Sequence, residues 1–323
     1  MRHLLRRIGF YLVALWASIT INFFIPRLAP GDPVGALLAR FQGKINPQAT
    51  AALELQFGIS HDPLWVQYLQ YLVKLFHGDL GISFTYFPTP VSTVLGQEIP
   101  WTLFLVGVSV IISFTLGTLL GIVIAWNRGS VLDGAVPPLL TFFSAVPYFW
   151  LALISLYIFG YTLGWFPLNG GYDISVTEGW NGDFVLSALQ HSLLPAFTIV
   201  LASIAGWMLG MRNNMITTMT EDYVLLAEAK GLSQRRVMFA YAARNAILPN
   251  VTAFALSLGF VVGGALLTEV VFSYPGIGFA LLQAAQNSDY PLLQGIFLCI
   301  AVAVIGANFV ADLVYTVLDP RVR

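Results

Sequence analysis

The chain has 323 residues, of which 57% are hydrophobic and 10% are charged, and its formal net charge is −1. Soluble globular proteins carry about 25% charged residues. So few charges cannot cover a water-exposed surface of this size, so the composition excludes an ordinary soluble protein and indicates a membrane protein. The absence of a basic run argues against a nucleic-acid partner, and the single cysteine, Cys299, excludes an intrachain disulfide.

Six windows without charged residues are long enough to cross a bilayer. The hydrocarbon core is about 30 Å thick and requires about 20 apolar residues of helix. The pattern therefore predicts an all-α membrane protein with six transmembrane helices. The windows lie between Arg7 and Arg27, Glu98 and Arg128, Asp133 and Asp173, Asp183 and Arg212, Arg244 and Glu269, and Asp289 and Asp312.

The first window also has the basic start of a secretory signal peptide, MRHLLRR. Its apolar stretch is longer than usual for such a signal and no clean cleavage site follows, which favours a retained helix. The chain then divides into three parts. Residues 1–29 hold the N-terminal tail and the first transmembrane helix, 30–97 form an external segment, and 98–323 form a five-helix core.

The distribution of basic residues predicts the orientation. With the N-terminus inside the cell, eleven of the 15 Lys and Arg fall in cytoplasmic segments and four in external ones. Most acidic residues fall outside, Glu269 and Asp289 among them. Because short cytoplasmic loops carry an excess of Lys and Arg, we expect both termini to be cytoplasmic.

The external segment 30–97 is not apolar enough to cross the membrane. Within it, Leu64–Phe76 has apolar and aromatic residues at helical spacing, which predicts an amphipathic helix. That helix could lie at the outer face, dock on a partner, or simply cap the bundle. The segment 164–183 is interpreted as a loop, and 272–278 as a turn-rich link that re-enters the membrane surface.

The longest polar interruption in the second half of the chain is Glu221–Pro249, within a predicted hairpin of residues 218–249. Gly231 divides it, and a glycine there can take the left-handed conformation that ends a helix. Ser233 is a favourable N-cap for a second helix. The apolar residues Leu225 and Leu226 are unsuited to full solvation, so we expect this hairpin to dock on a partner.

Motifs for catalysis, metal binding and phosphate binding are absent from the sequence, so we expect neither enzymatic activity nor a cofactor bound by this chain. The last windows contain small and polar residues of interest. Gly259, Gly263 and Gly264 allow close helix packing and could also mark a moving part. Asp312, the only acid well inside a window, could line a pathway or bond a neighbouring helix.

Several short motifs occur in order along the chain. They are PGDP (Pro30–Pro33), HGDLGIS (His77–Ser83), DYV (Asp222–Val224), AKGL (Ala229–Leu232), RNA (Arg244–Ala246) with Pro249, PGIG (Pro275–Gly278), DYP (Asp289–Pro291) and DPR (Asp319–Arg321). Together they resemble the permease subunits of ATP-binding-cassette importers of the dipeptide/oligopeptide type. Ala227 and Gly231 align with the E-A-A-x3-G loop of that superfamily, whereas Leu225 stands where its glutamate belongs.

The resemblance implies a type I importer permease in a prokaryotic inner membrane, with a second permease subunit, two cytoplasmic ATP-binding subunits that hold ATP and Mg²⁺, and an extracytoplasmic solute-binding protein. The hairpin would then be a coupling helix that enters a cleft of an ATP-binding subunit. The residues this implies for coupling are Asp222, Tyr223, Ala227, Glu228, Ala229, Gly231, Leu232 and Arg235.

The resemblance leaves the substrate open, because related permeases carry peptides, oligosaccharides or nickel complexes. A stand-alone secondary transporter is the alternative from another class. That alternative predicts membrane-buried charges and inverted repeats, of which the sequence shows one candidate acid and no evident repeat.

Overall fold

The computed structural model describes residues 2–28, 62–259, 261 and 266–318. Within these ranges the chain is helical and contains no strand, apart from an isolated bridge between Ile82 and Pro90. The all-α prediction is therefore confirmed for the described part of the chain.

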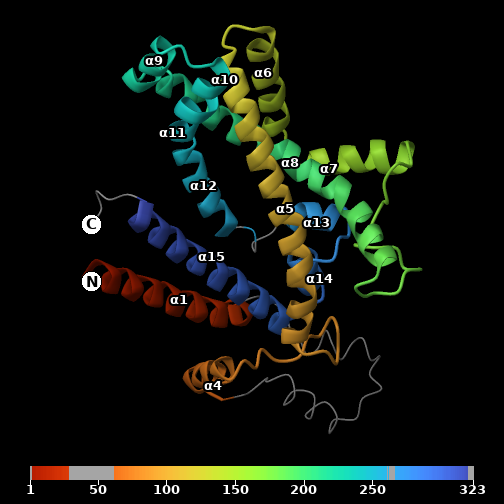
Figure 1. Cartoon of the computed structure of the whole chain (residues 1–323). Coiled ribbons are helices and arrows are strands. Elements are labelled where there is room, and N and C mark those ends of the chain that lie inside the picture. Colours follow the sequence, from red (N-terminus) through yellow and green to blue (C-terminus); the bar gives the residue numbers. More distant parts are fainter. Residues whose placement is uncertain (1, 29–61, 260, 262–265, 319–323) are drawn as a thin grey trace.

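Four described helices are long and apolar enough to cross a membrane. They are α1 (Arg2–Leu28), α5 (Val91–Trp126), α8 (Gly182–Thr218) and α15 (Tyr290–Leu318). Helix α5 begins seven residues before Glu98, within the segment 30–97, whose external position stays a prediction. Figure 1 shows α5 running the length of the molecule, from α14 at one end to α6 and α10 at the other.

The window between Asp133 and Asp173 is a bent pair rather than one straight helix. Helix α6 (Val131–Ala145) and the segment Tyr148–Thr162, made of α7 (Tyr148–Ser155) and a π-helical turn, meet at 95°. Pro147 explains the break, because a proline disfavours the helical conformation of the residue before it. Val146 is accordingly extended, with ψ 132°.

The window between Arg244 and Glu269 contains two short helices, α12 (Leu248–Gly259) and α13 (Leu266–Val271). Residues 260 and 262–265 lie outside the described residues. Counting the bent pair as one span, the described residues provide up to five membrane-crossing helices, and the sixth remains a prediction.

Helices α5 and α8 form the tightest contact between long helices. A Cβ atom added at Gly117 would lie 2.8 Å from the carbonyl oxygen of Ile204, and one at Gly121 would lie 2.6 Å from that of Met208. The two glycines, four residues apart, therefore let the backbones touch. The sequence analysis had looked for this kind of packing at Gly259.

The end of the bundle far from the hairpin is closed by α14 (Ile277–Gln286), which follows α13 after a short turn. Phe272, Tyr274 and Ile277 in and after this turn are 2%, 0% and 1% exposed. These large side chains pack into the core beside α5 and α8, and the position of 272–278 at the membrane surface stays a prediction.

Candidate functional site

The hairpin begins with α9 (Asp222–Ala229), and Gly231 ends it as expected. Gly231 has φ +72°. Its N–H donates to the carbonyl of Glu228 over 2.8 Å, and the N–H of Leu232 donates to that of Ala227 over 3.4 Å. This pair of bonds is the Schellman arrangement, which satisfies the last carbonyls of a helix and requires a left-handed residue at its turn.

The second arm of the hairpin is continuous from α10 (Gln234–Arg236) through a π-helical turn (Val237–Ala243) to α11 (Arg244–Ala246). Ser233 is the N-cap as predicted, but its side chain makes no capping bond; its carbonyl oxygen accepts from the N–H groups of the following turn instead. π-helical turns are rare in proteins, and those that occur are frequently found at functional sites.

One face of the hairpin packs on the transmembrane helices. It forms a hydrophobic cluster with the end of α5 and the last turns of α8, which anchors both arms. The buried members are Ile122, Ala125, Met211, Met215, Val224, Ala227, Val237, Ala242, Ala243 and Ala246. The alanines keep the arms close to the bundle because their side chains are short.

The opposite face of the hairpin is apolar and open. Leu225, Leu226 and Phe239 are 50%, 55% and 47% exposed. Met238, next to Phe239 in the sequence, is partly buried against the hydrophobic cluster. The exposed apolar face is what a docking surface requires.

A cavity of about 460 Å³ opens between the two arms. Its lining is basic and aromatic: Tyr223, Arg236, Ala240, Tyr241, Arg244 and Asn245. Both arginines are exposed, and in the described part of the chain neither makes a salt bridge to an acid. Two guanidinium groups beside tyrosine and asparagine side chains can bind carboxylate or phosphate groups.

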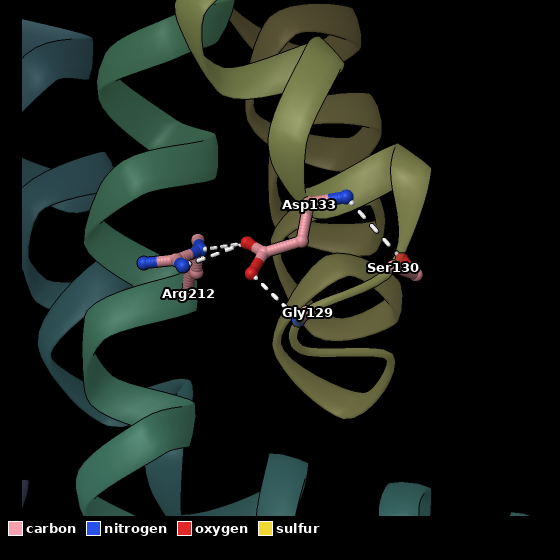
Figure 2. Close-up of polar contacts among 4 residues, drawn as sticks. All are labelled: Gly129, Ser130, Asp133 and Arg212. Atoms are coloured by element: carbon pink, nitrogen blue, oxygen red, sulfur yellow. Dashed lines mark hydrogen bonds and ion pairs between the residues drawn. The ribbon is translucent and has the colours of Figure 1, made fainter.

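An ion pair holds the transmembrane helices together near the hairpin. Figure 2 shows Arg212 of α8 reaching Asp133 in the first turn of α6, with Nη2 and Nε at 2.7 and 2.8 Å from one carboxylate oxygen. The other oxygen of Asp133 accepts from the N–H of Gly129 over 3.0 Å. The pair therefore links the turn after α5 to α8, the helix that leads into the hairpin.

A second polar site lies at the other end of α5, around Glu269. Glu269 is fully buried. Its carboxylate accepts from the Thr102 hydroxyl over 2.8 Å and from the N–H of Gly278 over 2.6 Å. The Thr102 oxygen in turn accepts from the N–H of Ile277 over 2.8 Å. We call Thr102, Glu269, Gly276 and Gly278 the Glu269 site.

The Glu269 site explains the two glycines of the PGIG motif. A Cβ atom at Gly276 would lie 2.6 Å from the Glu269 carboxylate, and one at Gly278 would lie 2.5 Å from the Cα atom of Leu266. Only a residue without a side chain permits this approach. Sequence analysis had placed Glu269 among the external acids and missed this site, because no local pattern links it to Thr102.

Asp289 joins two further motifs. It is fully buried and accepts from the Ser83 hydroxyl, from the N–H of Thr85 over 2.8 Å and from the N–H of Leu292 over 3.1 Å. The last bond caps the start of α15. The HGDLGIS and DYP motifs, far apart in the sequence, thus meet at one carboxylate.

Comparison with protein families identifies the class of this chain. Residues 117–323, more than half of the chain, match the family described as "Binding-protein-dependent transport system inner membrane component". The chain belongs to this family. With the apolar helices described above, it is a multi-pass inner membrane component.

Named relatives of this inner membrane component match along its whole length. The "Di/tripeptide transport system permease protein DppB" of Pseudomonas aeruginosa is 37% identical over 98% of this chain and 97% of its own. The "Oligopeptide transport system permease protein AppB" of Bacillus subtilis is 32% identical over 99% of both chains. The "Dipeptide transport system permease protein DppB" of Escherichia coli is 33% identical over 100% of this chain and 99% of its own.

In this inner membrane component, the residues predicted for coupling all lie on the hairpin. Ala227 is buried and Leu232 half-buried in the cluster beneath it, whereas Asp222, Tyr223, Glu228, Ala229, Gly231 and Arg235 are exposed. Of the predicted gating residues, Gly259 is the last residue of α12 and Asp312 lies in α15. Gly263 and Gly264, and the side chain of Asp312, lie outside the described residues.

Proposed function

We propose that this chain is the permease subunit of an ATP-driven importer that carries peptides across a prokaryotic cell membrane. The observation that carries the proposal is the full-length similarity to proteins named as di/tripeptide, dipeptide and oligopeptide permeases. None of these relatives is named for oligosaccharides, metal complexes or secondary transport, so peptides are the favoured substrate class.

The hairpin of residues 218–249 is the coupling element that docks on an ATP-binding subunit. Its buried face anchors it to α5 and α8, and its other face leaves Leu225, Leu226 and Phe239 exposed. A partner that covers these side chains would remove apolar surface from water, and movement of that partner would pass directly to the two transmembrane helices.

The arginine-lined cavity between the arms of the hairpin would receive acidic side chains of the same ATP-binding subunit. Arg236 and Arg244 carry positive charge without an acidic partner among the described residues, and guanidinium groups form strong paired hydrogen bonds with carboxylates. Replacing both by glutamine should weaken retention of the ATP-binding subunit and make the remaining affinity less sensitive to salt. Arg128→Gln, an exposed arginine outside the cavity, is the matched control.

This chain would bind neither ATP nor Mg²⁺, which belong to two ATP-binding partner subunits. A second permease subunit and an extracytoplasmic solute-binding protein would complete the importer. The purified chain alone should show no ATPase activity above background. The assembled transporter should hydrolyse ATP, faster when the loaded binding protein is present. Robust hydrolysis by the lone chain would overturn this assignment.

The type I architecture proposed here has six transmembrane helices and both termini in the cytoplasm, with the hairpin on the same side. The asymmetry of Lys and Arg supports it. In a Cys299→Ser background, Gln70→Cys on α4 should react with an impermeant thiol reagent from outside and Gln234→Cys on the hairpin only from inside. Reaction of both from the same side would contradict the topology.

A further inference from the structure

Helix α4 (Leu64–Phe76) is attached to α1 through one of its faces. The hydroxyl groups of Tyr68 and Thr20 are hydrogen-bonded over 2.7 Å. The ring of Phe23, which is fully buried, lies 5.1 Å from the ring of Tyr68 and 5.6 Å from that of Tyr71. Figure 1 shows α4 beside α1, at the end of the molecule opposite the hairpin.

A second face of α4 is a stripe of large apolar side chains that touch nothing in the described chain that would bury them. Trp65, Leu69, Val73 and Phe76 are 67%, 53%, 58% and 88% exposed. Their spacing of four, four and three residues places them on one side of an α-helix. We call these four residues the α4 stripe.

A third face of α4 is polar and consists of Gln67, Gln70 and Lys74. At 3.6 residues per turn, its centre lies roughly 130° around the helix from the centre of the α4 stripe. Gln70 and Lys74 are exposed. The helix therefore presents one face to α1, one polar face to water, and one apolar face that has no occupant among the residues that the structure describes.

The attachment to α1 sets the depth of α4 in the membrane. Thr20 and Phe23 lie inside the apolar span Ile8–Ile25 of α1. At 1.5 Å per residue they are roughly 3–8 Å short of the end of that span. A bilayer whose hydrocarbon core matches this span would therefore hold α4 at the level where the hydrocarbon ends and the headgroups begin.

Helix α1 also exposes large apolar side chains in the described structure. Trp16, Ile21 and Phe24 of α1 are 59%, 61% and 40% exposed, as expected for a transmembrane helix with a lipid-facing side. Tryptophan in particular is enriched where the apolar core meets the headgroups, and Trp65 is a member of the α4 stripe.

We propose that α4 is an interfacial helix whose stripe of Trp65, Leu69, Val73 and Phe76 is inserted among the lipids of the leaflet farther from the hairpin, while Gln67, Gln70 and Lys74 face water. Bound in this way, α4 clamps the end of α1 to the membrane surface. The occupant is lipid because the helix sits at the edge of the α1 span and because its polar and apolar faces divide as those of interfacial helices do.

The test uses site-directed spin labels on the assembled transporter in lipid nanodiscs. Cys299→Ser removes the single native cysteine, and Leu69→Cys and Phe76→Cys place labels on the α4 stripe. Gln70→Cys, one residue from Leu69 but on the polar face, is the matched control. Collision rates with oxygen, which dissolves in lipid, and with a water-soluble nickel chelate are then measured at each position.

We expect labels at positions 69 and 76 to collide with oxygen several-fold more than with the nickel chelate, relative to the label at 70. A label at either stripe position that meets the nickel chelate as freely as position 70 would show the face in water and overturn the proposal. Shielding of both stripe labels from both reagents would also overturn it, because a protein partner would then cover the face. The collision rates report on α4 in the assembled transporter and do not depend on which substrate the transporter carries.

Discussion

The turn after α9 in the hairpin and the turn after α13 beside the Glu269 site have the same backbone hydrogen bonding but lie in different surroundings. Helix α9 ends at Gly231 with φ +72°, and α13 ends at Ser273 with φ +45°. In both turns the next N–H reaches back to the helix, from Leu232 to Ala227 and from Tyr274 to Glu269. The backbone solution is therefore shared, although only one turn uses glycine.

The surroundings of the two turns differ. A Cβ atom at Gly231 would meet nothing within 4 Å. Tyr274 is fully buried, and its hydroxyl is hydrogen-bonded to that of Ser192 over 3.0 Å. The chain itself fills the space around the Glu269 site, which makes a serine in the left-handed conformation tolerable. The space around Gly231 stays open, as a site for a partner must.

The largest expected effect is that of Glu269→Ala. It removes the acceptor for the Thr102 hydroxyl and the Gly278 N–H, both buried, and leaves a cavity. We expect a loss of about 2–4 kcal/mol in the free energy of unfolding. Thermal unfolding of the purified protein in detergent measures it. Glu269→Gln keeps one acceptor oxygen and should lose clearly less; equal losses would show that hydrogen bonding is unimportant there.

Gly278→Ala should come next, because its Cβ atom would lie 2.5 Å from the backbone of Leu266. Overpacking of this kind costs about 1–3 kcal/mol, and the melting temperature should fall. Gly231→Ala is the comparison in the open turn. If Gly278→Ala does not change the melting temperature, α13 and α14 can move apart without loss of stability.

Gly231→Val should damage coupling rather than folding. A β-branched residue at φ +72° strains the turn by about 1–3 kcal/mol, which corresponds to roughly 5- to 150-fold in an equilibrium. The bundle is built elsewhere, so the protein should insert and purify normally. Retention of the ATP-binding subunit, or uptake per ATP hydrolysed, should fall. Wild-type transport and association at equal expression would remove the hairpin from the coupling mechanism.

The smallest effect is expected for Gly231→Ala. The added methyl group meets no neighbour, so only the left-handed conformation costs energy, about 1–2 kcal/mol. The strain is confined to the hairpin turn. Transport should fall less than in Gly231→Val, and the melting temperature should fall less than in Gly278→Ala. A large drop in melting temperature would show that the hairpin supports the bundle.

Local patterns predicted much of this protein. The apolar windows identified α1, α5, α8 and α15. A helix satisfies its own backbone hydrogen bonds, so a long apolar run is enough to let it cross the membrane. The turn at Gly231 was also predictable, since its hydrogen bonds span only a few residues. The bend at Pro147 was missed. The windows were defined by the absence of charged residues, and a proline does not interrupt such a window.

The sequence by itself therefore determined the membrane class, most of the spans and the hairpin turn, all of which depend on residues close together in the chain. Only the tertiary structure decided which distant groups meet. Thr102 and Glu269 are 167 residues apart, and Ser83 and Asp289 are 206 apart. No periodicity joins such pairs, because their contact depends on how the helices pack, and packing is a property of the whole bundle.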